Sequence, residues 1–125
     1  MAPRAMERVR RELKYEEVTP ISRREAIASL GSDDGNRVCD ALVRVAFHDS
    51  DWRWVQDQCI CLSLDQRASV RAISATCLGH LARIHGALDN EKVLPVLRKL
   101  LEDPETRGYA EDALDDIRMS LRWKR

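Results

Sequence analysis

Residues 70–81 read VRAISATCLGHL, and they line up with residues 106–117, TRGYAEDALDDI, at an offset of 36 residues. Each segment follows a short turn that contains an aspartate, Asp65 in the first copy and Asp103 in the second. A repeat of this length, built from two helical patterns, is typical of a solenoid of stacked helix pairs. Because such stacks present broad surfaces and seldom contain a reaction centre, the repeat favours binding over catalysis.

Length and composition favour a single all-α domain. The 125 residues contain no long polar linker, and a chain of this size can bury a core without metal or disulfide staples. Basic and acidic residues number 21 each, so the net charge indicates neither nucleic acid nor a membrane surface as partner. Apolar runs are also much shorter than the roughly 20 residues of a membrane-spanning helix. We therefore expect no direct nucleic-acid partner and no membrane partner.

The cysteines and the N-terminal residues indicate a cytoplasmic protein. Residues 1–8 lack the apolar stretch of a signal peptide. All four cysteines fall within apolar helical patterns, and a reducing compartment with four buried free thiols explains them better than disulfides do. These cysteines are Cys39, Cys59, Cys61 and Cys77.

Helix start and stop signals divide the chain into a leading helix and three helix pairs. We expect a basic helix over 5–16, within an N-terminal cap that spans 1–20, and a solenoid over 21–125. Glutamates interleave with the arginines of the leading helix, which favours a solvated cap over a nucleic-acid contact. The expected pairs span 22–48, 51–85 and 89–123. The expected N-cap residues are Ser22, Asp33 or Asp34, Asp51 and Asp89.

The repeated residues resemble HEAT repeats. The family pattern has an aspartate in the turn, a Val-Arg pair that opens the second helix, and small residues at fixed offsets. The resemblance is clear over about 51–119 and weak over 22–48. It implies an α-α superhelix of about three helix pairs whose second helices line the concave surface. The residues that carry it are Asp65, Val70-Arg71, Ala75 and Leu78-Gly79, then Asp103, Thr106-Arg107, Ala110, Ala113 and Leu114, with Asp115 in place of the glycine.

The arginine of the Val-Arg pair has a physical role that does not depend on the family name. Its stem can lie over the neighbouring repeat while its guanidinium bonds the turn carboxylate or free carbonyls. This applies to Arg71 most directly. The match is specific for fold and says almost nothing about function.

An acidic cluster near the C-terminus is the first candidate binding feature. Seven carboxylates lie within fifteen residues, opposed in that segment by Arg107 alone. Helical spacing places three of them on one face together with Met119, and a cationic partner would relieve their repulsion. The plain alternative is a solvated helix face. The cluster comprises Glu102, Asp103, Glu105, Glu111, Asp112, Asp115 and Asp116.

Trp54, His80 and Arg83 are further candidate contacts. Trp52 and Trp54 cannot both face the core at a spacing of two, so we expect Trp54 to be partly exposed at a hot spot, or to anchor a repeat junction. His80 is expected as a surface imidazole beside the buried thiol of Cys77. Tyr109 is open to both interpretations.

No metal, cofactor or catalytic site is expected. Cys59 and Cys61 point to different sides of a helix, and the three histidines share no ligand spacing. No glycine-rich phosphate loop and no catalytic motif occurs.

These observations predict a non-catalytic, protein-binding module. Small size, an acidic ridge and the absence of chemistry resemble HEAT-like immunity proteins of bacterial toxin systems. That resemblance implies a monomer that forms a heterodimer with a basic toxin domain and thereby inhibits it. Two alternatives stay open: a scaffold or assembly adaptor, and an enzyme similar to HEAT-like bilin lyases or DNA glycosylases. The residues predicted to contact the partner are Glu111, Asp112, Asp115, Asp116, Trp54, His80 and Arg83.

Overall fold

The structure, a computed structural model, describes residues 18–121 and is all-helical there. The helices form the three consecutive pairs expected from the sequence, so the fold class is confirmed. The expected leading helix over 5–16, and with it most of the proposed cap, lies outside the described residues. The helices are α2 (Arg23–Leu30), α3 (Gly35–His48), α4 (Trp52–Leu62), α5 (Ala68–His85), α6 (Asn90–Glu102) and α7 (Arg107–Leu121).

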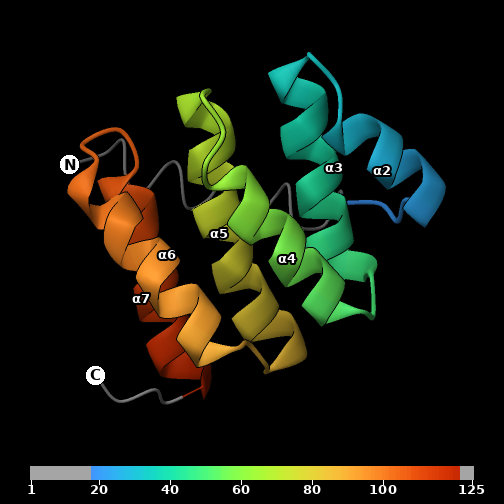
Figure 1. The fold of residues 1–125 in the computed structure, drawn as a ribbon. Coiled ribbons are helices and arrows are strands. Elements are labelled where there is room, and N and C mark those ends of the chain that lie inside the picture. The colour runs from blue at the N-terminus through green and yellow to red at the C-terminus, as the bar shows by residue number, and fades with distance from the viewer. Residues whose placement is uncertain (1–17, 122–125) are drawn as a thin grey trace, which may run out of the picture.

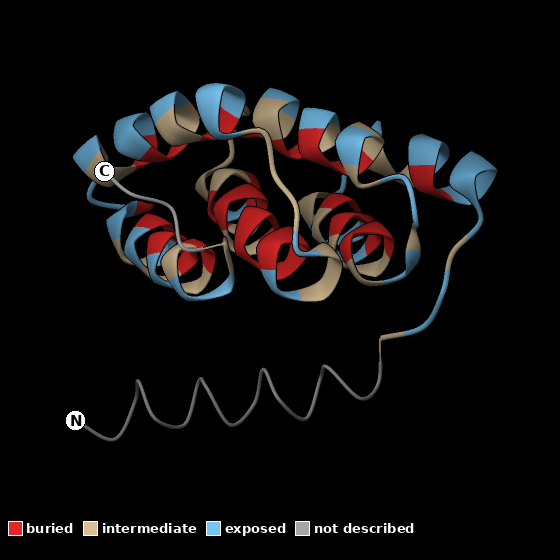
Figure 2. Ribbon diagram, turned by 90° about the horizontal axis from the view of Figure 1, so that it is seen from below, coloured by how far each residue is buried: buried red, intermediate tan, exposed pale blue. Residues whose placement is uncertain are grey.

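The pairs stack into two layers (Figure 1). The first helices of the pairs, α2, α4 and α6, form one layer, and the second helices, α3, α5 and α7, form the other. Figure 2 shows the first-helix layer spread over the longer arc, so the second-helix layer lies on the inner side of the curve. α5 packs most extensively on α7 and then on α3, which makes the second-helix layer continuous.

The hydrophobic core lies between the layers and is centred on α5. Apolar residues recur at steps of three and four residues and so lie on one side of each helix. That side packs against the other helix of the same pair. Figure 2 shows α5 as the most thoroughly buried helix, because it has neighbours on both sides and above. The largest fully buried apolar side chains include Leu42, Leu78, Leu81, Leu97 and Ile117.

Most of the predicted caps form. The Oγ of Ser22 accepts from the N–H of Glu25 at 3.1 Å, and Asp34 and Asp51 cap α3 and α4 with their carboxylates. Asp89 occupies the predicted N-cap position of α6, but its side chain makes no capping hydrogen bond. The position is therefore confirmed, and the expected side-chain cap is wrong. Instead the N–H of Asp89 donates to Oε1 of the buried Gln56 at 2.7 Å, which ties α4 to the turn before α6.

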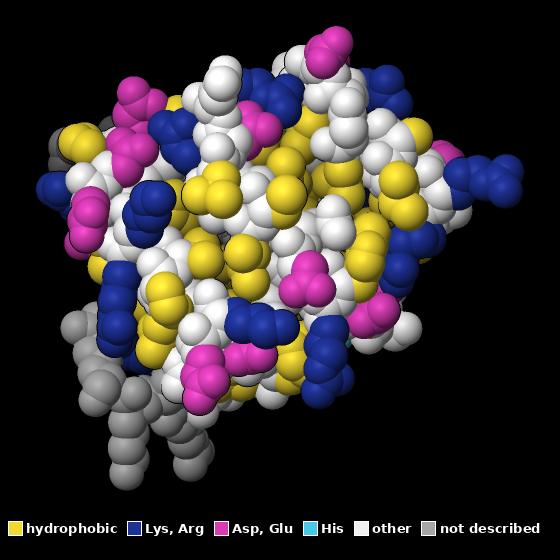
Figure 3. Space-filling view, in the orientation of Figure 1, with side chains coloured by type: hydrophobic (Ala, Val, Ile, Leu, Met, Phe, Trp, Pro, Cys, Tyr) yellow, Lys and Arg dark blue, Asp and Glu magenta, His cyan; other side chains and the backbone are white. Residues whose placement is uncertain are grey.

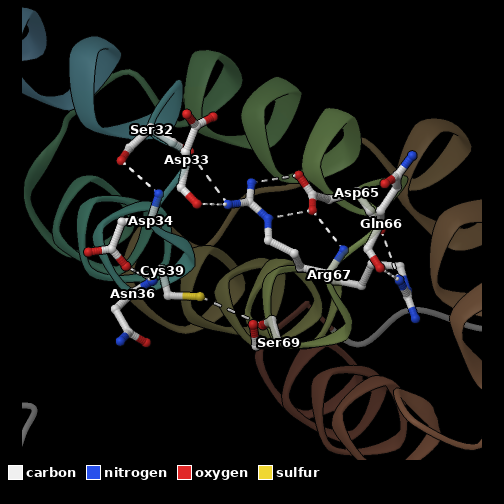
Figure 4. A network of polar contacts seen from close by, with 10 residues as sticks. Ser32, Asp33, Asp34, Asn36, Cys39, Asp65, Gln66, Arg67 and Ser69 are labelled. Atoms are coloured by element: carbon white, nitrogen blue, oxygen red, sulfur yellow. Dashed lines mark hydrogen bonds and ion pairs between the residues drawn. The ribbon is translucent and has the colours of Figure 1, made fainter.

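Arginines join the turns of neighbouring repeats along one edge of the stack (Figure 4). Nη1 of Arg71 donates to the carbonyls of Asp65 and Gln66, both at 2.9 Å, and Nη2 donates to Asp103 at 3.1 Å. This confirms the role predicted for Arg71. Arg67 reaches the opposite way: its Nη1 donates to the carbonyl of Asp33 at 3.2 Å. The two side chains therefore connect all three intra-repeat turns.

Gly79 allows α5 and α7 to approach closely. A Cβ at this position would lie 3.0 Å from Oδ2 of Asp116 and 3.3 Å from the Cα of Ala113. The second contact is to backbone, which cannot swing aside. The small residue predicted here from the repeat pattern is therefore required by the packing of the second-helix layer.

We expect Asp65 to stabilise the fold in a pH-dependent way. Side-chain hydrogen bonds from Arg67 lower the pKa of the Asp65 carboxyl from 3.8 to about 2. Because the folded-state pKa lies below the unfolded one, the contribution is complete above about pH 5 and is lost as the pH falls toward 2. Asp65→Asn should lower the free energy of unfolding at pH 7 and much less at pH 2.5, as measured by urea unfolding.

The control for this prediction is Asp57→Asn, which changes an exposed aspartate of α4. Its unfolding free energy should stay within about 0.5 kcal/mol of the unmodified chain at each pH. A destabilisation by Asp65→Asn that is equally large at pH 7 and pH 2.5 would contradict the ionic role of Asp65.

Candidate protein-binding surface

α7 presents the predicted carboxylates on its solvent-facing side. Its core-facing side consists of Ala110, Ala113, Leu114 and Ile117, all buried against α5 and α6. The residues between them therefore point away from the core, as helical spacing predicts. Glu111 and Asp115 are exposed, and Asp112 and Asp116 are half-buried. We call these four residues the α7 acidic face.

Arginines from other parts of the chain pair with much of the C-terminal acidic cluster. Arg83 of α5 lies 3.7 Å from Asp116, and Arg118 donates to Asp115 at 3.3 Å. Arg71 pairs with Asp103 at 3.1 Å. Arg107 is the one basic residue within 102–116, but the superhelix also brings Arg83 of α5 against Asp116 of α7 and Arg71 of α5 against Asp103 in the turn before α7.

His80 and Arg83 belong to a row of contacts that crosses the second-helix layer. The ring of His80 meets Phe47 of α3 edge-on, with ring centroids 4.9 Å apart. Its Nδ1 accepts a hydrogen bond from Nη2 of Arg83, whose Nε lies 3.7 Å from Asp116 of α7. The row therefore links α3, α5 and α7, and it brings the predicted residues His80, Arg83 and Asp116 together.

The expectation of a surface imidazole is wrong. His80 is only 8% exposed, because α5 is flanked on both sides by other second helices and Phe47 covers the ring. His80 thus accepts a hydrogen bond from Arg83 and has little exposed surface of its own for a partner to contact.

Trp54 lies apart from the other predicted site residues. It is half-buried, as expected, but it belongs to α4 in the first-helix layer. The guanidinium of Arg23, from α2, covers its ring at 3.9 Å, and the same arginine pairs with Asp49 at 3.0 Å. The structure therefore does not join Trp54 to the α7 acidic face, and its contacts are those of an anchor between the first two repeats.

The first-helix side has a mixed surface. Figure 3 shows this side, on which apolar side chains lie among charged groups of both signs. Beside it, at the edge formed by the turns, an open hollow of about 340 Å³ is lined by Asp33, Asp65, Gln66 and Arg67. Arg67 donates hydrogen bonds there to Asp65 and to the carbonyls of the neighbouring turn (Figure 4). The residues that line the hollow therefore hold the turns together.

The sequence placed Met119 on the face of the carboxylates and left Tyr109 open to both interpretations, and the structure exposes both side chains. Tyr109 is 50% exposed and Met119 is 83% exposed. Their positions outside the buried stripe of α7 were a usable signal, because an apolar residue that breaks a polar helix face has no packing role in its own domain.

Burial makes two of the four cysteine thiols harder to ionise. Burial raises the pKa of the Cys77 thiol well above its ordinary value and also raises that of Cys39, which disfavours the reactive thiolate. Cys59 and Cys77 are buried as expected, whereas Cys39 is half-buried and Cys61 is exposed, which corrects the prediction of four buried thiols. Among residues 18–121 all four thiols are free, and no group of histidine, cysteine and carboxylate side chains could hold a metal ion.

No helix within residues 18–121 is both long enough and apolar enough to cross a membrane.

Comparison with known proteins finds a similar chain among the solved structures. No protein-family model and no curated protein matches the sequence, so the HEAT resemblance stays a prediction while the helical superhelix itself is observed. A chain in the crystal structure of a CDI complex from Cupriavidus taiwanensis LMG 19424 has a similar fold, with a TM-score of 0.74 and 32% sequence identity. The match covers 82% of the present chain and 93% of the other. At this identity and coverage, the protein belongs to the same family as that component of the Cupriavidus taiwanensis CDI complex.

Proposed function

We propose that the chain is an immunity protein of a contact-dependent inhibition (CDI) system, which binds a toxin domain and blocks it without chemistry of its own. The observation that carries this proposal is the relative of known structure: it comes from a CDI complex, and the two chains match over nearly the whole of the relative's length. A helical stack with a continuous second-helix layer supplies the broad surface that such binding needs.

The α7 acidic face is the part of this surface that we assign to the toxin. Glu111 and Asp115 are exposed there, and Arg83 holds Asp116 in place from the neighbouring helix. Positioned carboxylates attract a partner of opposite charge and fix its orientation on encounter. The toxin domain is therefore basic where it contacts α7, as expected of a domain that acts on nucleic acid.

The complex is a heterodimer of one immunity chain and one toxin domain. A partner that covers the second-helix layer at α5 and α7 would occlude the area of a standard interface, about 800 Å² on each side. The rings of His80 and Phe47 pack edge-on within this layer, and we expect this contact to limit the rearrangement on binding.

Protection of growth tests this function. We expect the toxin gene to lie beside the gene for this chain, so the probe is the toxin domain encoded there, induced in a bacterial host with and without the chain. Induction of the toxin domain alone should arrest growth, and co-induction of the chain should restore it. Recovery of the two proteins together, with toxin levels unchanged on an immunoblot, shows that restoration reflects binding. Growth arrest that persists at equal toxin and immunity levels would contradict the proposal.

A further inference from the structure

Four large apolar side chains are strongly exposed in the described part of the chain, and two of them share one helix. Tyr109 and Met119 lie on α7, near its two ends, and are 50% and 83% exposed. The other two lie on separate elements: Ile27 on α2 at 56% and Leu64 in the turn after α4 at 70%. Single exposed apolar residues such as Ile27 and Leu64 are ordinary on protein surfaces.

Tyr109 and Met119 lie on the same side of α7 as Asp112 and Asp116. Positions 109, 112, 116 and 119 follow one another at steps of three and four residues, so they form one stripe along the helix. The stripe has an aromatic ring at one end, Asp112 and Asp116 in the middle, and a thioether at the other end. With a rise of about 1.5 Å per residue, the two apolar side chains stand roughly 15 Å apart.

This arrangement has the composition of an interface centre and differs from that of a solvated helix. Aromatic residues and methionine are enriched at protein–protein contacts, where a few buried anchors contribute most of the affinity. The flexible thioether of methionine fits pockets of irregular shape. Carboxylates between two apolar residues call for a partner with positive charge between two apolar depressions.

We propose that Tyr109 and Met119 are the anchor residues of the toxin interface, and that they insert into two apolar depressions flanking a basic patch on the toxin domain. The inference rests on the proposed function, and it adds which residues retain the partner once it has bound. The α7 acidic face sets the rate of encounter, because long-range attraction acts before contact. The two anchors set the rate of dissociation, because their buried contacts must be broken for the toxin to leave.

The two roles are separable by binding kinetics on immobilised toxin domain from the adjacent gene. Tyr109→Ala and Met119→Ala should each raise the dissociation rate at least 10-fold and change the association rate less than twofold. The change should be the same at 50 and at 300 mM salt. Tyr109→Phe, which retains the ring, should raise the dissociation rate less than threefold.

The matched controls are Ile27→Ala and Leu64→Ala, which remove equally exposed apolar side chains from other parts of the surface. They should leave both rates within twofold of the unmodified chain. Unchanged dissociation in Met119→Ala, or an equal effect from Leu64→Ala, would overturn the anchor proposal while leaving the immunity function intact. Failure of the unmodified chain to bind the toxin domain would overturn the immunity function, and the anchor proposal with it. Met119 is so exposed that its truncation leaves the fold unaffected.

Discussion

Replacing Asp112, Asp115 and Asp116 by lysine should weaken toxin binding at least 1,000-fold while the helical fold is retained. The substitution turns three negative charges into three positive ones at the centre of the surface, where juxtaposed like charges cost several kcal/mol. The equilibrium dissociation constant, measured by calorimetry at 150 mM salt, gives the size of the effect. The far-ultraviolet circular dichroism of the variant should match that of the unmodified chain.

A milder variant separates charge from packing. Glu111→Lys combined with Asp115→Lys changes the two exposed carboxylates only, so that Arg83 keeps Asp116 and the row to His80 and Phe47 stays in place. The matched control, Asp57→Lys with Glu91→Lys, makes the same change in net charge at exposed positions on α4 and α6. If the control weakens binding as much as the α7 double variant does, the effect comes from net charge and the assignment of α7 to the interface is wrong.

Gly79→Val should destabilise the fold by about 3 kcal/mol, because side-chain atoms would have to fit where α5 meets α7. The backbone of Ala113, 3.3 Å from the position of a Cβ, cannot move without shifting α7. α7 carries the acidic face, so the substitution should also weaken toxin binding. Urea unfolding measures the first effect, and calorimetric titration with the toxin domain measures the second.

Gly108, on α7, lies where an added side chain has room, in contrast to Gly79. A Cβ added there would have no neighbour within 4 Å. Gly108→Ala should stabilise the fold by about 0.5 kcal/mol, since alanine loses less conformational entropy than glycine on forming a helix. A destabilisation by Gly108→Ala comparable with that of Gly79→Val would show that the close contact with α7 is not what makes Gly79 necessary.

The helices were predictable because their signals are local. Caps such as Ser22 and Asp51, together with apolar residues at three- and four-residue steps, give each helix its bounds without reference to the rest of the fold. The repeat of 36 residues then defined how the pairs stack. Arg71 was also predictable, because the same short pattern places its guanidinium within reach of adjoining turns.

The candidate site was less predictable, because it depends on contacts between helices that are distant in sequence. The burial of His80 requires Phe47, 33 positions earlier in the chain, and the pairing of Asp116 requires Arg83 on another helix. Trp54 is separated from α7 because α4 belongs to the first-helix layer and α7 to the second-helix layer. The spacing of residues in the sequence does not show this separation. Periodicity within one helix indicates what faces outward, and it cannot indicate which groups from other helices lie beside them.

The central claim is that this chain binds one toxin domain through the face of α7. Calorimetric titration of the unmodified chain with the toxin domain encoded by the adjacent gene tests it most directly. We predict a 1:1 complex with a dissociation constant of about 10 nM or tighter, weakened at least 10-fold by Glu111→Lys with Asp115→Lys. The absence of binding heat at micromolar concentrations, or 1:1 binding that this α7 double variant leaves unchanged, would contradict the account.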